Sequence, residues 1–73
     1  MPYTEEHLRT AQMNVAESEK RVSRLSDVVA HLRQHGQSTA SAEAQLSQFH
    51  AMARAYRERR EELEAILKQR KAR

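Results

Sequence analysis

The feature that most constrains the fold is a series of apolar residues that recur at alternating intervals of three and four. In the first half of the chain its members are Leu8, Ala11, Val15, Ser18, Val22, Leu25, Val29 and Leu32, of which only Ser18 is polar. An α-helix has 3.6 residues per turn, so this spacing places all of them on one stripe, at heptad positions a and d of a coiled coil. The pattern predicts one long helix packed against a second.

The second half of the chain repeats the same period, with Arg60 as its polar exception. Its members are Ala42, Leu46, Phe49, Ala53, Tyr56, Arg60, Leu63 and Leu67. We call the two series together the seam, because they are expected to face each other. The chain has no glycine or proline after residue 36, so nothing in its composition interrupts this second helix.

Local signals mark the ends of the two helices. Thr4 precedes two acidic residues, which is typical of a helix N-cap. Gly36 follows the first series, where a left-handed glycine can end a helix. Residues 37–41 are rich in small polar side chains and predict a loop, with Ser41 as the expected cap of the second helix.

We therefore predict an all-α fold: an antiparallel two-helix hairpin, or coiled coil, in which each helix is about 45 Å long. Residues 1–73 form a single domain, with a helix over 4–35, a loop over 36–39, a helix over 40–71 and a basic C-terminal end.

The register follows from the two polar exceptions. Seam residues whose numbers sum to 78 are expected to pair, which brings Ser18 opposite Arg60 and leaves room for the guanidinium to reach water. The flanking residues agree, because Arg33 then falls beside Glu43 and Glu19 beside Arg57. In the same register Arg21 lies near Arg59, a like-charge mismatch for which the sequence offers no explanation.

The apolar stripe is wider than a two-helix seam requires. Val28, Met52 and Ile66 occupy heptad position g, next to the seam and on one side of the hairpin. A chain of this size also struggles to bury enough core alone. These residues are our candidate oligomer interface, and they predict a homodimer in which two hairpins form a four-helix bundle. The alternatives are a larger assembly or one with another, unknown protein, and a monomer with scattered exposed apolar residues.

Chemistry-bearing motifs are sparse. Without cysteine there is neither a disulfide framework nor a thiolate metal site. His31 and His35 share a helix face, and His50 is expected near the same end of the hairpin, but no third ligand is fixed by spacing. Two helices cannot wall off a pocket of the size that small-molecule sites usually have. We predict no catalytic residues, no metal site, no cofactor and no enzymatic activity.

Nucleic-acid binding is the main alternative function. The net charge is +3, and residues 36–73 carry eight basic and five acidic side chains. The candidate contacts are Arg54, Arg57, Lys68, Arg70, Lys71 and Arg73. Glutamates interleaved over residues 58–64 weaken this field, and Phe49 and Tyr56 are expected in the seam rather than free to stack on bases.

Membranes are not expected partners, since the chain contains no run of 18 apolar residues and the apolar face of its second helix is occupied by the first. The N-terminus also lacks the basic-then-apolar order of a signal peptide, which predicts a cytoplasmic location.

The centre of the sequence resembles a group of short, uncharacterised bacterial proteins. The shared pattern is Leu32-x3-Gly36-x2-Thr39-x2-Ala42-x3-Leu46-x2-Phe49, and the resemblance to these proteins also covers the apolar positions from Leu8 to Leu25. The resemblance brings no known activity. It implies that Gly36 and Thr39 form a fixed turn between the helices, and that Thr39 rather than Ser41 caps the second one. The function we expect is a non-enzymatic interaction or adaptor module whose partner the sequence does not name.

Overall fold

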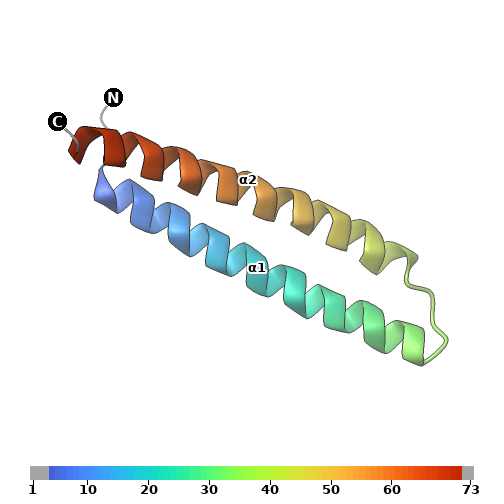
Figure 1. Cartoon of the computed structure of the whole chain (residues 1–73). Helices are drawn as coiled ribbons and strands as arrows, with labels where there is room; N and C mark the ends of the chain where they lie inside the picture. Colours follow the sequence, from blue (N-terminus) through green and yellow to red (C-terminus); the bar gives the residue numbers. More distant parts are fainter. Residues whose placement is uncertain (1–3, 72–73) are drawn as a thin grey trace.

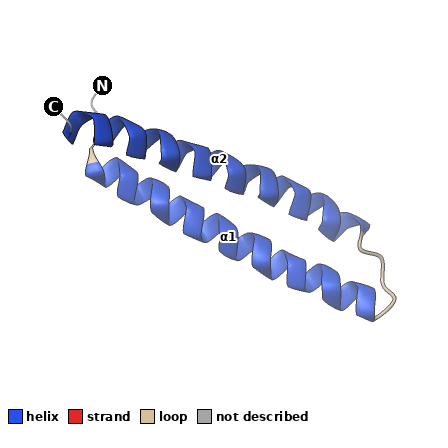
Figure 2. Cartoon of the chain, viewed as in Figure 1, coloured by secondary structure: helices blue, strands red, loops and turns tan. Residues whose placement is uncertain are grey.

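The chain forms two long helices joined by a short connection. The computed structural model describes residues 4–71, with α1 over Glu5–Gln34 and α2 over Ala40–Lys71. The helices run antiparallel along their whole length, as Figure 1 shows, in a rod that measures 58 × 17 × 14 Å. Residues 4–71 contain no strand (Figure 2). The predicted all-α hairpin is confirmed, and both helices begin and end within one residue of the ranges expected from the sequence.

The N-terminus of α1 is closed by a reciprocal pair of hydrogen bonds. The hydroxyl of Thr4 accepts from the backbone N–H of His7 at 3.4 Å, and the backbone N–H of Thr4 donates to Nδ1 of His7 at 3.0 Å. This is a capping box, with histidine in the position where glutamate or glutamine is usual. Thr4 is therefore the N-cap that the sequence predicted, whereas the part played by His7 was not foreseen.

The C-terminus of α1 ends in a Schellman motif centred on Gly36. The backbone N–H of Gln37 donates to the carbonyl of Leu32 at 2.9 Å, and that of Gly36 donates to the carbonyl of Arg33 at 3.2 Å. The motif requires a left-handed residue after the helix, and Gly36 has a φ of 67°. Glycine reaches this conformation without strain, so it stops the helix where the apolar series stops.

The start of α2 decides between the two expected caps. The carbonyl of Thr39 accepts from the backbone N–H of Glu43 at 2.8 Å, which is the first hydrogen bond of the helix. The expectation that Ser41 caps α2 is wrong, because Ser41 already lies inside its first turn. Thr39 is also half-buried, so its side chain lies at the end of the packed region.

The core of the hairpin is the seam. Every residue of the two apolar series is buried or half-buried, and among residues 4–70 only Thr39 and Ile66 join them. The buried apolar members are Ala11, Val15, Val29, Ala53, Leu63 and Leu67. The larger side chains of the loop-side half, such as Leu25 and Phe49, stay half-exposed. Two helices thus give a thin core, and its apolar edges remain in contact with water.

Each of the two polar residues of the seam contacts a partner within its own helix. Ser18 is buried and its hydroxyl donates to the carbonyl of Val15 at 2.8 Å. Arg60 is half-buried, and its Nε lies 3.3 Å from a carboxylate oxygen of Glu64, one turn on. That contact is an ion pair without hydrogen-bond geometry, because the buried Nε has no hydrogen-bond partner in the described residues.

One of the two predicted flanking pairs forms. Arg33 and Glu43 are joined across the helices by a hydrogen-bonded ion pair of 2.8 Å. Glu19 and Arg57 make no ion pair within the described part of the chain, although they have opposite charges. The register argument therefore holds at the loop end, where the connection is short, and the second pair adds nothing to it.

Candidate interaction surface

The three candidate interface residues lie on one side of the hairpin, which we call the g side. In an antiparallel pair of helices, heptad positions g of both helices flank the same edge of the seam. Val28 on α1 is 46% exposed and Met52 on α2 is 40% exposed, while Ile66 is half-buried. The first two are among the few large apolar side chains that the described residues present to water.

The exposed Val28 borders a shallow apolar hollow. This hollow has a volume of about 200 Å³, and its walls are Leu25 and Val28 of α1, Phe49 of α2, and the side chains of Arg21 and Arg24. Leu25 and Phe49 are seam residues, so the core of the hairpin is reachable from the g side at this point. An apolar side chain from another molecule fits such a hollow better than a polar one.

The g side carries two apolar patches rather than one. Met52 and Ile66 are 14 residues apart, which corresponds to about 21 Å along the helix. Arg59 lies midway between them and approaches Glu62 at 3.5 Å. In the register fixed by Arg33 and Glu43, Val28 is level with Met52, and Arg21 is level with Arg59. A charged belt therefore separates the Val28–Met52 patch from Ile66.

The most exposed large apolar residue lies elsewhere. Met13 is 63% exposed and occupies heptad position f, on the side of α1 that faces away from the seam. Met13 belongs to no periodic series, so the sequence pattern gives no sign of its exposure. A lone exposed methionine is ordinary on a protein surface, and Met13 supplies a useful control for substitutions on the g side.

The basic candidates lie on the opposite side, which we call the e side and which carries heptad positions b and e. Arg54, Arg57 and Lys68 are all exposed there. Glu61 and Glu64 are exposed among them. Two basic, two acidic and one basic side chain thus follow one another along this side, and residues 4–70 contain no longer run of cations here that would track a phosphate backbone.

The remaining basic candidates cluster at the end of α2. Arg70 is exposed and Lys71 is the last residue of the helix, whereas Arg73 lies outside the described residues. The two candidate stacking residues, Phe49 and Tyr56, are half-buried in the seam. Base stacking needs an exposed aromatic face, and these rings do not supply one.

A second hollow, of about 550 Å³, lies on the e side of α2. Its lining residues are Glu43, Leu46, Ser47, His50, Ala51 and Arg54. Ser47 and His50 share this space, yet no hydrogen bond joins them, and Glu43 is engaged by Arg33. A serine nucleophile needs a base within hydrogen-bonding distance and a third group that orients the base. This open hollow lacks that arrangement.

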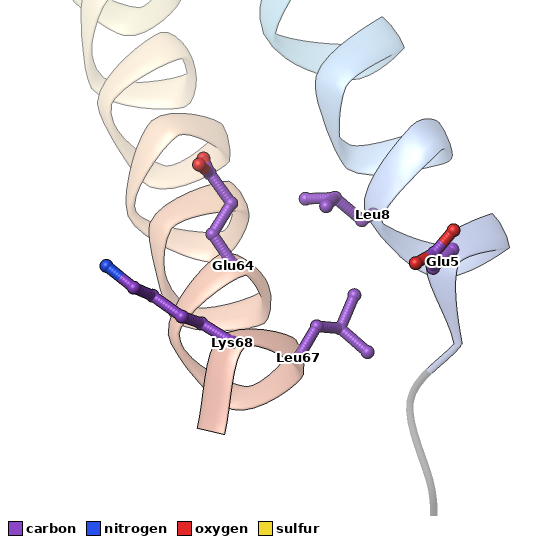
Figure 3. Close-up of a pocket in the computed structure, with 5 residues that line it drawn as sticks. All are labelled: Glu5, Leu8, Glu64, Leu67 and Lys68. Atoms are coloured by element: carbon purple, nitrogen blue, oxygen red, sulfur yellow. The ribbon is translucent and has the colours of Figure 1, made fainter. Parts of the chain in front are cut away.

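A third hollow, of about 320 Å³, lies at the open end of the hairpin, where α1 begins and α2 ends (Figure 3). Leu8 and Leu67 point from the two helices into the space between them, and Lys68 extends along the outside of α2. Glu5 and Glu64 complete the rim. The hollow is the open end of the seam. These three hollows are open to solvent on the surface of the two helices, and none of the three is an enclosed cavity.

The histidines do not assemble into a metal site. The rings of His31 and His35 lie with their centroids 4.3 Å apart. His50 occupies heptad position e of α2, on the e side of the hairpin. Over the residues that the structure describes, no group of three or more potential ligands is close enough to hold a metal ion.

The described helices also contain no stretch long and apolar enough to cross a membrane. Comparisons of the chain with protein-family models, with curated proteins and with solved structures find no match. The surface itself, and above all the g side, is therefore the basis for assigning a function.

Proposed function

We propose that this protein is a non-enzymatic helical interaction module that associates with a second copy of itself through the g side. The main support for this proposal is that Val28 and Met52 are exposed beside the apolar hollow between Leu25 and Phe49. Apolar surface left in water costs roughly 25 cal/mol per Å². Covering it gives the two-helix hairpin the second layer that its thin core lacks, as in a four-helix bundle.

The thinness of the core supports the same proposal. Among the described residues no large side chain is wholly buried, and Leu25, Leu32, Leu46 and Phe49 all stay half-exposed. Small domains usually supplement a core of this size with disulfides, a bound metal or association with a partner. The chain has no cysteine, and the described residues include no group of three or more potential metal ligands, which favours a partner.

The test is the mass in solution, measured by light scattering after size exclusion over a range of concentrations. We expect a dimer for the native chain and a monomer for Val28→Glu combined with Met52→Glu. The matched control is Met13→Glu, which places the same charge on a still more exposed apolar residue, on the side of α1 that faces away from the seam. A double variant that keeps the dimer contradicts the interface, and a monomeric native chain contradicts self-association.

The alternative function is binding of RNA or DNA by a small basic dimer. It is favoured by the net charge and by the exposure of Arg54, Arg57 and Lys68 on one side of α2. Phosphate neutralisation makes such affinity fall steeply with salt. If reversing the charges of Lys68, Arg70 and Lys71 leaves nucleic-acid affinity unchanged, this alternative is excluded. For the main proposal, the interaction module, we also propose a cytoplasmic location. Fractionation of cells that produce the protein tests this location.

A further inference from the structure

The g side has a symmetry that points to the arrangement of the second copy. Met52 and Ile66 each lie seven residues from Arg59, one toward the loop and one toward the open end. The charges on α1 are opposite on the two sides of Arg21, with Arg24 toward the loop and Glu17 toward the open end. A half-turn about the level of Arg21 and Arg59 therefore exchanges Met52 with Ile66 and brings Arg24 toward Glu17, while Val28 falls over Asn14 and each central arginine over its own copy.

We propose that a second copy covers the g side through a two-fold axis that crosses both helices at the level of Arg21 and Arg59. Met52 then lies over the partner's Ile66, and Arg24 lies over the partner's Glu17, each contact occurring twice. This inference rests on the proposed self-association and specifies its geometry. It also accounts for Ile66, which the Val28–Met52 patch leaves unexplained.

Two other arrangements are less favourable in their charges. An axis parallel to the hairpin keeps every residue at its own level, so Glu17 faces the partner's Glu62 and Arg24 gains no carboxylate. Like charges placed opposite each other oppose association. An axis at the level of Val28 and Met52 joins two apolar patches, but it leaves Ile66 uncovered and provides no carboxylate for Arg24.

The arginines at the centre set a limit on affinity. Arg59 is 45% exposed at its side chain and has Glu62 within 3.5 Å, so its charge enters the interface with an acidic neighbour. Long arginine stems extend toward the rim and keep the guanidinium in water. Even so, two copies bring like charges to one level, and we expect Arg59→Leu to tighten the dimer about tenfold.

The absence of cysteine allows a direct test by disulfide trapping. Each arrangement brings a different pair within the 7 Å between Cα atoms that a disulfide tolerates. When Met52→Cys and Ile66→Cys chains are mixed and oxidised, the proposed axis predicts a linked dimer that contains one of each. Met52→Cys alone links to itself only if the axis passes at Met52, and it links to Val28→Cys chains only if the axis is parallel to the hairpin.

The competing pairs are well separated in the proposed dimer. Positions 52 and 66 are about 21 Å apart along one helix, so two copies of Met52→Cys stay far beyond disulfide range. Met13→Cys mixed with Ile66→Cys is the matched control for random collision, because Met13 lies on the opposite side of α1. A dominant Met52–Met52 or Met52–Val28 product overturns the arrangement.

A charge exchange provides the second measurement. Arg24→Glu and Glu17→Arg are each expected to weaken the dimer about tenfold, because each places like charges opposite each other twice. The double variant restores the opposite signs and is expected to recover most of the lost affinity. Independent losses that add up in the double variant contradict the pairing.

The two proposals fail in different ways. If light scattering finds only monomer for the native chain, self-association itself is wrong. If the native chain is a dimer but neither the Met52–Ile66 disulfide nor the charge exchange behaves as expected, the interaction module stands and only the two-fold arrangement is wrong.

Discussion

Arg33 of α1 and Glu43 of α2 form a hydrogen-bonded ion pair of 2.8 Å across the loop end of the hairpin. Only ten residues separate them, yet they belong to different helices, so the contact forms only when the chain reverses direction in one particular register. Both side chains are well exposed to water, at 67% and 49%. Their value lies in selecting the register more than in adding stability.

Reversing this pair has a defined outcome. We expect Glu43→Arg to lower the free energy of unfolding by about 0.5–1 kcal/mol, because it replaces an attraction by a repulsion. Chemical denaturation monitored by circular dichroism measures the change. Exchange of the two residues, Arg33→Glu with Glu43→Arg, is expected to recover the loss. If the exchange destabilises as much as the single change, the ion pair is not what the residues contribute.

Gly36 is expected to tolerate substitution poorly for a reason that lies in the backbone. Its φ is 67°, and a Cβ at this position would meet no atom within 4 Å, so there is no steric clash to relieve. Gly36→Ala should lower the free energy of unfolding by about 1–2 kcal/mol through the left-handed conformation alone. Gly36→Asn, which enters that conformation more easily, is the matched control and should lose less. Equal losses for the two variants would contradict this explanation.

Arg60 is the residue of the seam whose replacement is expected to stabilise the hairpin. Its buried Nε has an ion-pair neighbour but no hydrogen bond, and the small Ser18 faces it in the sequence register. Arg60→Leu is expected to raise the free energy of unfolding by about 1 kcal/mol, since leucine removes a buried polar atom that lacks a hydrogen bond and adds apolar surface to the seam. Arg54→Leu, at an exposed position, serves as the control. A lower stability for Arg60→Leu would show that the arginine stem packs better than leucine.

The capping box at Thr4 is expected to set the stability of the open end. Thr4→Ala removes the acceptor for the N–H of His7 and should cost about 1 kcal/mol. Thr4→Ser keeps the hydroxyl and should cost much less. Hydrogen exchange of the amides in the first turn of α1 reports the loss locally, and unchanged exchange in Thr4→Ala would mean that packing, not the cap, holds this turn.

The fold was predictable because its dominant interaction is periodic. The spacing from Leu8 to Leu32 and from Ala42 to Leu67 identified every seam residue, including the two polar ones, before any coordinates were considered. Thr39 lies in the loop, as predicted, yet it is seven residues before Leu46 and its half-buried side chain continues the series. His7 escaped notice because capping boxes usually use glutamate or glutamine at that position.

The candidate surface was predictable only in outline. Heptad position placed Val28, Met52 and Ile66 on one side, but periodicity carries no information about how side chains of different size leave space between them. The hollow bordered by Leu25 and Phe49 depends on that packing. The charged belt at Arg21 and Arg59 was visible in the sequence as a mismatch, and only its position between two apolar patches gives it a role in the proposed dimer.

The hairpin also has a built-in gradient in the length of chain that each contact must close. Arg33 and Glu43 meet across ten residues, whereas Leu8 and Leu67 line the same hollow across 59 residues. Loop-closure entropy rises with the logarithm of that length, a difference of about 1.6 kcal/mol between the two ends for an otherwise unfolded chain. Folding is therefore expected to nucleate beside Gly36 and to proceed toward the helix ends, so that each turn shortens the effective loop for the next. An antiparallel pair of helices in one chain thus gains an ordered folding route that two separate helices do not have.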